Sequence, residues 1–153
     1  ISLNFMLIRK FEAKDQIPAR GVINAGLLEY FGILDESLNP DLDNIALSFS
    51  DGCFLVGEVD GELVVTGGYK RFDDQTVKIE RVFVHAKFRR HGLASQIFSA
   101  LIAEAKKVGY KRVVLETTSD WQGAIDFWLR NGFRITHVDD SGEWSETWFE
   151  RKI

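Results

Sequence analysis

The segment best suited to ligand binding is His85-Ala86-Lys87-Phe88-Arg89-Arg90-His91-Gly92, between a predicted strand ending at Val84 and a predicted helix starting at Leu93. The first backbone N–H groups of a helix are unpaired and carry partial positive charge, so a helix N-terminus binds phosphate well. Gly92 lets the backbone approach a ligand closely, and Arg89 and Arg90 add fixed positive charge. The segment therefore predicts a pyrophosphate cradle, although the chain has neither a P-loop lysine motif nor a GxGxxG fingerprint.

This cradle needs a strand before it and a helix after it, and the patterns predict both. Apolar residues recur about once per turn from Leu93 to Val108, and Gly109 follows as a helix stop. Arg112–Thr117 reads as a buried strand because its centre is a continuous apolar run. Strand, long helix and strand form a βαβ unit, so Val77–Val84 and Arg112–Thr117 should lie parallel.

Further elements are predicted on both sides of this unit. Asp41 or Asp43 could cap a short helix, and Ser119 with Gln122 forms a capping box for a later one. The remaining predicted elements are strand Phe5–Phe11, helix Pro18–Tyr30, strands Cys53–Val59 and Glu62–Arg71 around an Asp60-Gly61 turn, a last helix ending at Gly132, and strands Phe133–Val138 and Glu146–Arg151.

Composition restricts the function classes. The 153 residues are 45% hydrophobic, which fits one folded domain spanning 1–153. A net charge of −4 argues against a nucleic-acid-binding face. The single cysteine, Cys53, permits no internal disulfide, and the histidines lack metal-ligand spacing, so no metal is expected. No apolar stretch approaches the ~20 residues that span a bilayer, and no signal peptide is visible, so we expect no membrane partner and a cytoplasmic location.

Two motifs carry a family resemblance. Arg89-x-x-Gly92-x-Ala94, after Val82-x-Val84, resembles the acetyl-CoA signature [R/Q]-x-x-G-x-[G/A] of the GNAT superfamily of N-acetyltransferases. Ala124-Ile125-x-Phe127-Trp128-x-x-x-Gly132-Phe133 resembles the closing motif of that family, and Leu115-Glu116-Thr117 fits its fifth strand. The order of predicted strands agrees as well. The resemblance therefore covers nearly the whole chain.

The resemblance implies a fold and a reaction. The fold would be of the α/β (α+β) class: a mixed, mostly antiparallel twisted sheet, with a central parallel strand pair splayed for acetyl-CoA and helices on both faces. Acetyl-CoA would be the cosubstrate, and its acetyl group would pass directly to a primary amine of a small molecule. The cofactor-binding residues implied are Phe83, Val84, Arg89, Arg90, His91, Gly92, Leu93, Ala94 and Trp128.

Two glutamates are catalytic candidates on the same resemblance. A carboxylate on the fourth strand can serve as general base in the family, and Glu80 lies on that predicted strand. Glu116 ends the fifth strand near the expected thioester, where it could be the base, a substrate anchor or a helix cap. The alternative for Glu80 is an ion pair with a basic neighbour on its own strand.

The chain also departs from the family pattern. Trp128 stands where a tyrosine often protonates the leaving CoA thiolate, and an indole is not a usable acid. Tyr69 and Tyr110 are candidate replacements. A non-catalytic acyl-CoA-binding regulatory module and a protein or peptide N-acetyltransferase therefore remain as alternatives. Trp144 and Trp148 could wall the acceptor site or belong to the core or a homodimer surface.

Overall fold

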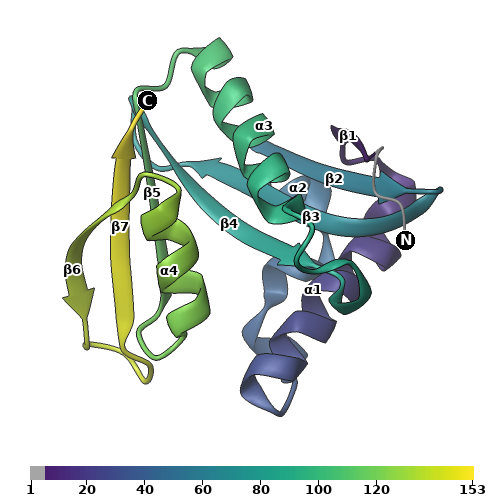
Figure 1. Cartoon of the computed structure of the whole chain (residues 1–153), viewed down its shortest axis with the longest axis horizontal. Helices are drawn as coiled ribbons and strands as arrows, with labels where there is room; N and C mark the ends of the chain where they lie inside the picture. Colours follow the sequence, from purple (N-terminus) through teal and green to yellow (C-terminus); the bar gives the residue numbers. More distant parts are fainter. Residues whose placement is uncertain (1–5) are drawn as a thin grey trace.

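The computed structural model describes residues 6–153, which form a seven-stranded sheet with helices on both faces (Figure 1). The strand order is β1-β2-β3-β4-β5-β7-β6, and only the β4–β5 pair is parallel. The strands are β1 (Leu7–Lys10), β2 (Cys53–Val59), β3 (Glu62–Arg71), β4 (Thr76–Val84), β5 (Arg112–Thr118), β6 (Arg134–Asp139) and β7 (Glu146–Lys152). The helices are α1 (Gln16–Phe31), α2 (Ile45–Ser48), α3 (Leu93–Val108) and α4 (Gln122–Arg130).

The alternation of side chains along β2 divides the core into two layers. Phe54 and Val56 pack in a cluster with α1, whereas Leu55 between them packs in a second cluster with α3. Because successive side chains of a strand point to opposite faces, α1 and α3 must cover opposite faces of the sheet. Figure 1 shows this arrangement, with α3 in front of the sheet and α1 behind it.

The predicted order of elements and the parallel pairing of β4 with β5 are confirmed. Asp60 and Gly61 both have positive φ, 51° and 81°, as a tight two-residue hairpin requires. Gly109, at φ 111°, ends α3. The first strand is shorter than predicted, since β1 begins at Leu7, and the predicted starting residue Phe5 lies outside the described residues.

The predicted cap of α2 is wrong. The side chain of Asn44 caps this helix by accepting from a backbone N–H of its first turn. Asp41 and Asp43 are instead engaged by arginines, Asp41 by Arg81 and Asp43 by Arg20. A guanidinium is a stronger partner for a carboxylate than a backbone amide, so tertiary contacts override the local capping preference.

The predicted cap of α4 is also wrong. This helix starts at Gln122 after Trp121, and no side chain caps it. Ser119 Oγ lies 2.9 Å from Thr147 Oγ1 and accepts a hydrogen bond from Ser145 Oγ at 2.9 Å. Its hydroxyl thus ties the loop after β5 to β7 and is not available to the helix.

A β-bulge separates the two parallel strands. β4 and β5 pair only over Thr76–Lys78 and Arg112–Val114. Beyond that point the β3–β4 register shifts, and Arg81 adopts φ 61° with its carbonyl accepting a hydrogen bond from Thr66 Oγ1 at 2.8 Å. A bulge bends its strand and increases its twist, so β4 turns away from β5. Figure 1 shows the two strands diverging toward their carboxyl ends.

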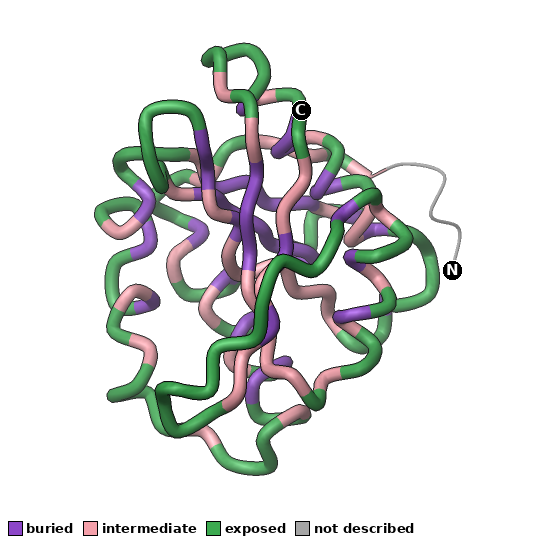
Figure 2. Tube along the Cα trace, turned by 90° about the vertical axis from the view of Figure 1, so that its left-hand side faces the viewer, coloured by how far each residue is buried: buried purple, intermediate pink, exposed green. Residues whose placement is uncertain are grey.

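In the part of the chain that the structure describes, no further strand pairs with the edge of the sheet that β6 forms. Every residue of β6 is exposed, and β6 pairs with β7 alone. Figure 2 faces this edge, where the strand is coloured as exposed along its length. Within residues 6–153, no helix has the length and apolar character needed to cross a membrane.

Candidate active site

A cleft opens where β4 and β5 diverge. Its volume is about 1180 Å³. One wall is β4 from Lys78 to Val84, and the other is the end of β5 with the first turns of α4. The N-terminus of α3 closes one end, and the C-terminal part of α1 lies at the other side. Because β4 has no partner strand on this side beyond Lys78, its backbone edge borders the cleft.

The α3 end of the cleft has the geometry of an anion site. Gly92 is the N-cap of α3, with φ 73°, and no side chain caps the helix. A Cβ at Gly92 would meet no atom within 4 Å, so space in front of the first helical amides is open. Arg90 is also left-handed, at φ 67°, and the buried ring of Phe88 anchors the loop. Together these features leave the first N–H groups of α3 directed at the cleft.

The cationic side chains of the loop differ in their environment. Arg89 Nη1 donates to Glu29 at 2.6 Å, and its Nε donates to the carbonyl of Val84 at 3.3 Å. The hydrogen bond and charge of Arg89 lower the pKa of the Glu29 carboxyl. Arg90 is exposed and lines the cleft. His91 is exposed too, but it does not line the cleft.

Apart from His91, all the residues predicted for the site line this one cleft. These residues are Glu80, Phe83, Val84, Arg89, Arg90, Gly92, Leu93, Ala94, Glu116 and Trp128.

Trp128 forms part of the core at the cleft floor. It is 7% exposed and makes edge contacts with Phe98 and Phe133, with ring centroids 5.4 and 5.3 Å apart. The candidate acids Tyr69 and Tyr110 do not line the cleft. Burial raises the pKa of Tyr69 to about 12, which makes it a still weaker acid at neutral pH.

Tyr30 is the tyrosine that the structure places at the cleft. Its ring stacks on Trp121 with centroids 4.3 Å apart, and its hydroxyl donates to Asp120 at 2.5 Å. Burial and the Asp120 hydrogen bond raise the pKa of Tyr30 to about 12. Its place was not predicted, because α1 and the loop after β5 are about 90 residues apart in sequence.

Charged side chains gather where the two strands begin to separate. Lys78 Nζ donates to Glu116 at 2.6 Å and lies 3.4 Å from Glu80, which is also 3.2 Å from Lys70 Nζ. Burial disfavours the Lys78 ammonium, but the hydrogen bond and charge of Glu116 outweigh it and raise the pKa of Lys78. Both predicted carboxylates thus lie in the cleft, and both are ion-paired with the same lysine.

Glu146 of β7 is a further member of this group that sequence reasoning missed. It lines the cleft within hydrogen-bonding reach of Glu116. The hydrogen bond with Glu116, burial and the negative charge of Glu116 raise the pKa of Glu146 to about 7. Burial opposes ionisation of Glu116, but the hydrogen bonds from Glu146 and Lys78 outweigh it and lower the pKa of Glu116. Alternation along Glu146–Lys152 could have marked this residue, but its strand partner could not be read from the chain.

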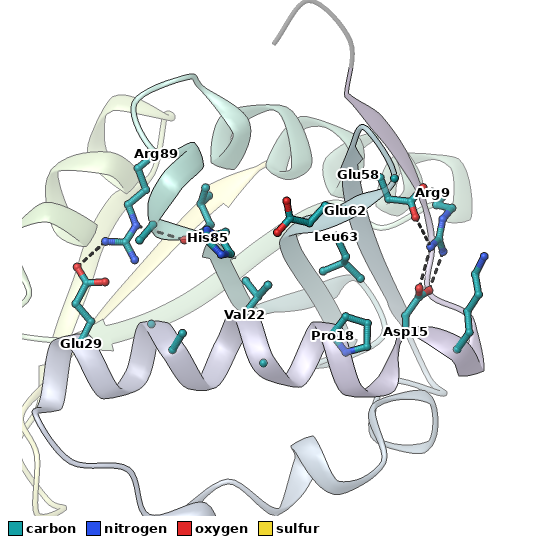
Figure 3. A pocket seen from close by; sticks show the side chains of 17 residues that line it. Arg9, Asp15, Pro18, Val22, Glu29, Glu58, Glu62, Leu63, His85 and Arg89 are labelled. Atoms are coloured by element: carbon teal, nitrogen blue, oxygen red, sulfur yellow. Dashed lines mark hydrogen bonds and ion pairs between the residues drawn. The ribbon is translucent and has the colours of Figure 1, made fainter. Parts of the chain in front are cut away.

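A second, smaller cavity of about 650 Å³ lies beside α1, bordered by the β2–β3 turn and the loop after β4 (Figure 3). Arg9 closes one end by donating to both carboxylate oxygens of Asp15, at 2.7 and 2.8 Å, and to Glu58 at 3.1 Å. The Arg89–Glu29 ion pair lies at the other end, between this cavity and the cleft. Neither cavity holds three or more metal-ligating side chains grouped for an ion, among the residues described.

Comparisons with known proteins agree with this geometry. A model of the acetyltransferase (GNAT) family matches residues 23–133. "Uncharacterized N-acetyltransferase YjgM" of Escherichia coli (strain K12) is 26% identical over 141 residues, 87% of this chain and 83% of that protein. "Probable N-acetyltransferase camello" of Xenopus tropicalis is 27% identical over 116 residues, 72% of this chain and 53% of that protein. The chain thus spans about half the length of the second relative.

Solved structures share the fold. An acetyltransferase of the GNAT family from Staphylococcus aureus Mu50 superimposes with a TM-score of 0.87 at 21% identity, covering 97% of this chain and 99% of that one. The PaiA N-acetyltransferase from Thermoplasma acidophilum, solved in complex with coenzyme A, gives a TM-score of 0.81 at 20% identity, covering 97% and 99%. Since the family model spans the chain from α1 to the residue before β6, this protein belongs to the acetyltransferase (GNAT) family.

Proposed function

We propose that this protein is an acetyl-CoA-dependent N-acetyltransferase that transfers the acetyl group directly to a primary amine of a small molecule. One observation carries the proposal: a single cleft runs from the uncapped N-terminus of α3 to the carboxylates between β4 and β5. The first end suits phosphates, and the second suits deprotonation of an amine.

The α3 end would hold the pyrophosphate of the cosubstrate. The backbone amides from about Arg90 to Ala94 supply donors, and Arg89 and Arg90 supply charge. The pantetheine amides would pair with the free backbone edge of β4 near Phe83 and Val84. This path would bring the thioester to the point where the strands separate, close to Glu80 and Glu116.

The reaction needs an attacking amine without its proton. The amine nitrogen would attack the thioester carbon, and the tetrahedral intermediate would collapse by breaking the carbon–sulfur bond. Either Glu80 or Glu116 could receive the amine proton, since both line this part of the cleft. The thiolate can leave without a strong acid catalyst, because a thiol has an ordinary pKa of about 8.5. Trp128 at the usual tyrosine position is therefore compatible with turnover.

The acceptor would enter from the α1 side. Tyr30, Phe31 and Trp121 line that side of the cleft. Aromatic rings from α1 and from the loop after β5 therefore border this side of the cleft, and Phe31 also contacts Trp144 of the β6–β7 turn, with ring centroids 5.4 Å apart. A non-catalytic acyl-CoA-binding module would bind the cosubstrate without needing these features. A peptide N-acetyltransferase would need room for an extended chain.

A screen of amines separates these functions. The purified protein is mixed with acetyl-CoA and a panel of amino acids, polyamines, aromatic amines and short peptides, and free CoA is measured. The proposal predicts CoA release with small primary amines well above the rate without acceptor. Acetyl-CoA binding with no turnover on any amine would favour the regulatory module, and turnover restricted to peptides would favour the protein-modifying enzyme.

A further inference from the structure

The register of β5 and β7 places two carboxyl groups side by side in the cleft. Thr118 lies opposite Glu146, and Glu116 lies opposite Trp148. Residues two apart on a strand share a face, so Glu116 and Glu146 project from neighbouring strands on the same side of the sheet. Both line the cleft beyond Lys78, the last residue of β4 that pairs with β5.

The charged groups around Glu146 leave an excess of negative charge. Glu116 faces it from β5, Asp139 faces it from β6 as its partner in the register, and Lys78 faces it from β4. Lys78 is shared with Glu116 at 2.6 Å and with Glu80 at 3.4 Å. Lys78 therefore serves the Glu116–Glu146 pair and also contacts Glu80, which has a second ammonium partner in Lys70. A second cation in this place would be stabilised, and so would a proton on one of the carboxyls.

We propose that Glu116 and Glu146 act together as the general base of acetyl transfer, binding the acceptor as an ammonium ion and taking its proton. Glu146 is the member that receives it. The ammonium gives one proton to the doubly ionised pair, which becomes singly ionised, and the neutral amine attacks the thioester carbon. As the carbon–sulfur bond breaks, the nitrogen loses its second proton to the departing thiolate, which leaves as the thiol, and the proton on Glu146 passes to solvent. This inference rests on the transferase function proposed above.

The surroundings of the pair suit this role better than those of Glu80. Glu80 lies between two ammonium groups, Lys70 at 3.2 Å and Lys78 at 3.4 Å, so protonating it would leave both without their shared partner. The pair is suited to take up a proton close to neutral pH, because Glu116 and burial raise the pKa of Glu146 to about 7. A base with a pKa near the working pH is the most effective proton acceptor. Aromatic rings on the α1 side of the cleft add favourable surroundings for a cation.

The test is the pH dependence of kcat/KM for two acceptor amines whose own pKa values differ by about one unit. In the wild type, we expect activity to rise through about pH 7 for both amines, because the enzyme supplies the titrating group. In Glu146→Gln, the midpoint of the rise in kcat/KM with pH should move up to the pKa of each amine. Activity at pH 7 should fall on the order of 100-fold, and the loss should shrink at higher pH.

Controls separate this inference from the function on which it rests. Glu143→Gln alters an exposed carboxylate in the β6–β7 turn that does not line the cleft, and it should leave the profile unchanged. Glu146→Gln should keep the wild-type increase in melting temperature with acetyl-CoA.

If the wild type releases no CoA with any amine, both proposals fail. If it turns over but its rise follows the pKa of each amine, or if Glu146→Gln keeps the wild-type profile, only the carboxyl pair is refuted. The two-amine comparison uses the wild type alone, so it decides the question even if the variant does not fold.

Discussion

Replacing Gly92 tests the phosphate cradle, and the structure predicts its effects on stability and on binding separately. Gly92 has φ 73°, a left-handed conformation that costs other L-residues about 1–2 kcal/mol. A Cβ there would meet no atom within 4 Å, so Gly92→Ala and Gly92→Glu should carry that conformational cost without a clash. For a chain of this size, each kcal/mol lowers the melting temperature by about 2–4 °C, so both variants should remain folded.

Binding should distinguish the two variants. The Gly92→Glu side chain would add a negative charge where the pyrophosphate is expected. Two like unit charges about 5 Å apart repel by about 3 kcal/mol at an effective dielectric constant of about 20. That energy corresponds to a loss of affinity on the order of 100-fold, whereas Gly92→Ala adds only a methyl group at the rim.

Isothermal titration calorimetry with acetyl-CoA measures this difference, and Gly92→Ala is the matched control because it shares the backbone cost. The same titration with a pantetheine analogue that lacks the pyrophosphate should show little difference between the variants. The reasoning is refuted if Gly92→Ala and Gly92→Glu bind acetyl-CoA with equal affinity.

Three further predictions concern charged groups. The raised pKa of Glu146 favours its protonated form in the fold, so the stability it contributes is fully present below its ordinary value of about 4.3 and is lost as the pH rises through about 7. The melting temperature should therefore fall between pH 5 and 8, and Glu146→Gln should flatten that fall; an unchanged slope in the variant would assign it to other groups. The hydrogen bonds from Arg9 hold the pKa of Asp15 below its usual range, so its contribution is present above about pH 3.9 and is lost as the pH falls through the lower folded value. Asp15→Asn should lower the free energy of unfolding by about 3 kcal/mol at pH 7, measured by urea titration, because Asp15 is buried and Arg9 would keep only Glu58 in place of its two hydrogen bonds to Asp15. A change within about 0.5 kcal/mol, as is usual at surface sites, would show that the pair is replaceable. Arg81→Lys should break the bidentate hydrogen bond with Asp41 and loosen the segment after α1. The KM for the amine should rise while the affinity for acetyl-CoA stays the same. An equal change in the amine KM and in the acetyl-CoA affinity would contradict the assignment of the two substrates to different ends of the cleft.

The uncapped start of α3, where we propose the phosphate cradle, could be predicted from the sequence because its geometry is local. Gly92 follows a strand and precedes a helix with a clear apolar stripe, so the pattern alone places helical amides next to a residue without a side chain. Periodicity likewise predicted the order of strands and helices, since burial of one face imposes a repeat on each segment. The handedness of a βαβ connection then implied the parallel pair of β4 and β5.

Predictions from local sequence patterns were wrong where a side chain has a stronger partner far away in the sequence. Ser119 has the spacing of a helix cap, but its hydroxyl bonds to β7. The sequence does not indicate the left-handed backbone conformation of Arg81, because an arginine side chain does not by itself specify a β-bulge. Its carbonyl is held by Thr66, and its guanidinium is held by Asp41, 40 residues away in sequence.

The carboxyl pair is the clearest case of a feature decided by tertiary structure. In the sequence, Glu146 opens a strand after a polar turn and resembles a solvent-exposed residue, whereas Glu116 ends a buried strand 30 positions earlier. The sheet order, in which β7 inserts between β5 and β6, brings the two together beside Lys78. The sequence alone determined which side chains are ionisable. The fold decided which of them interact and so have shifted pKa values, because the energy of a charge depends on its burial and on the charges that lie within a few ångströms.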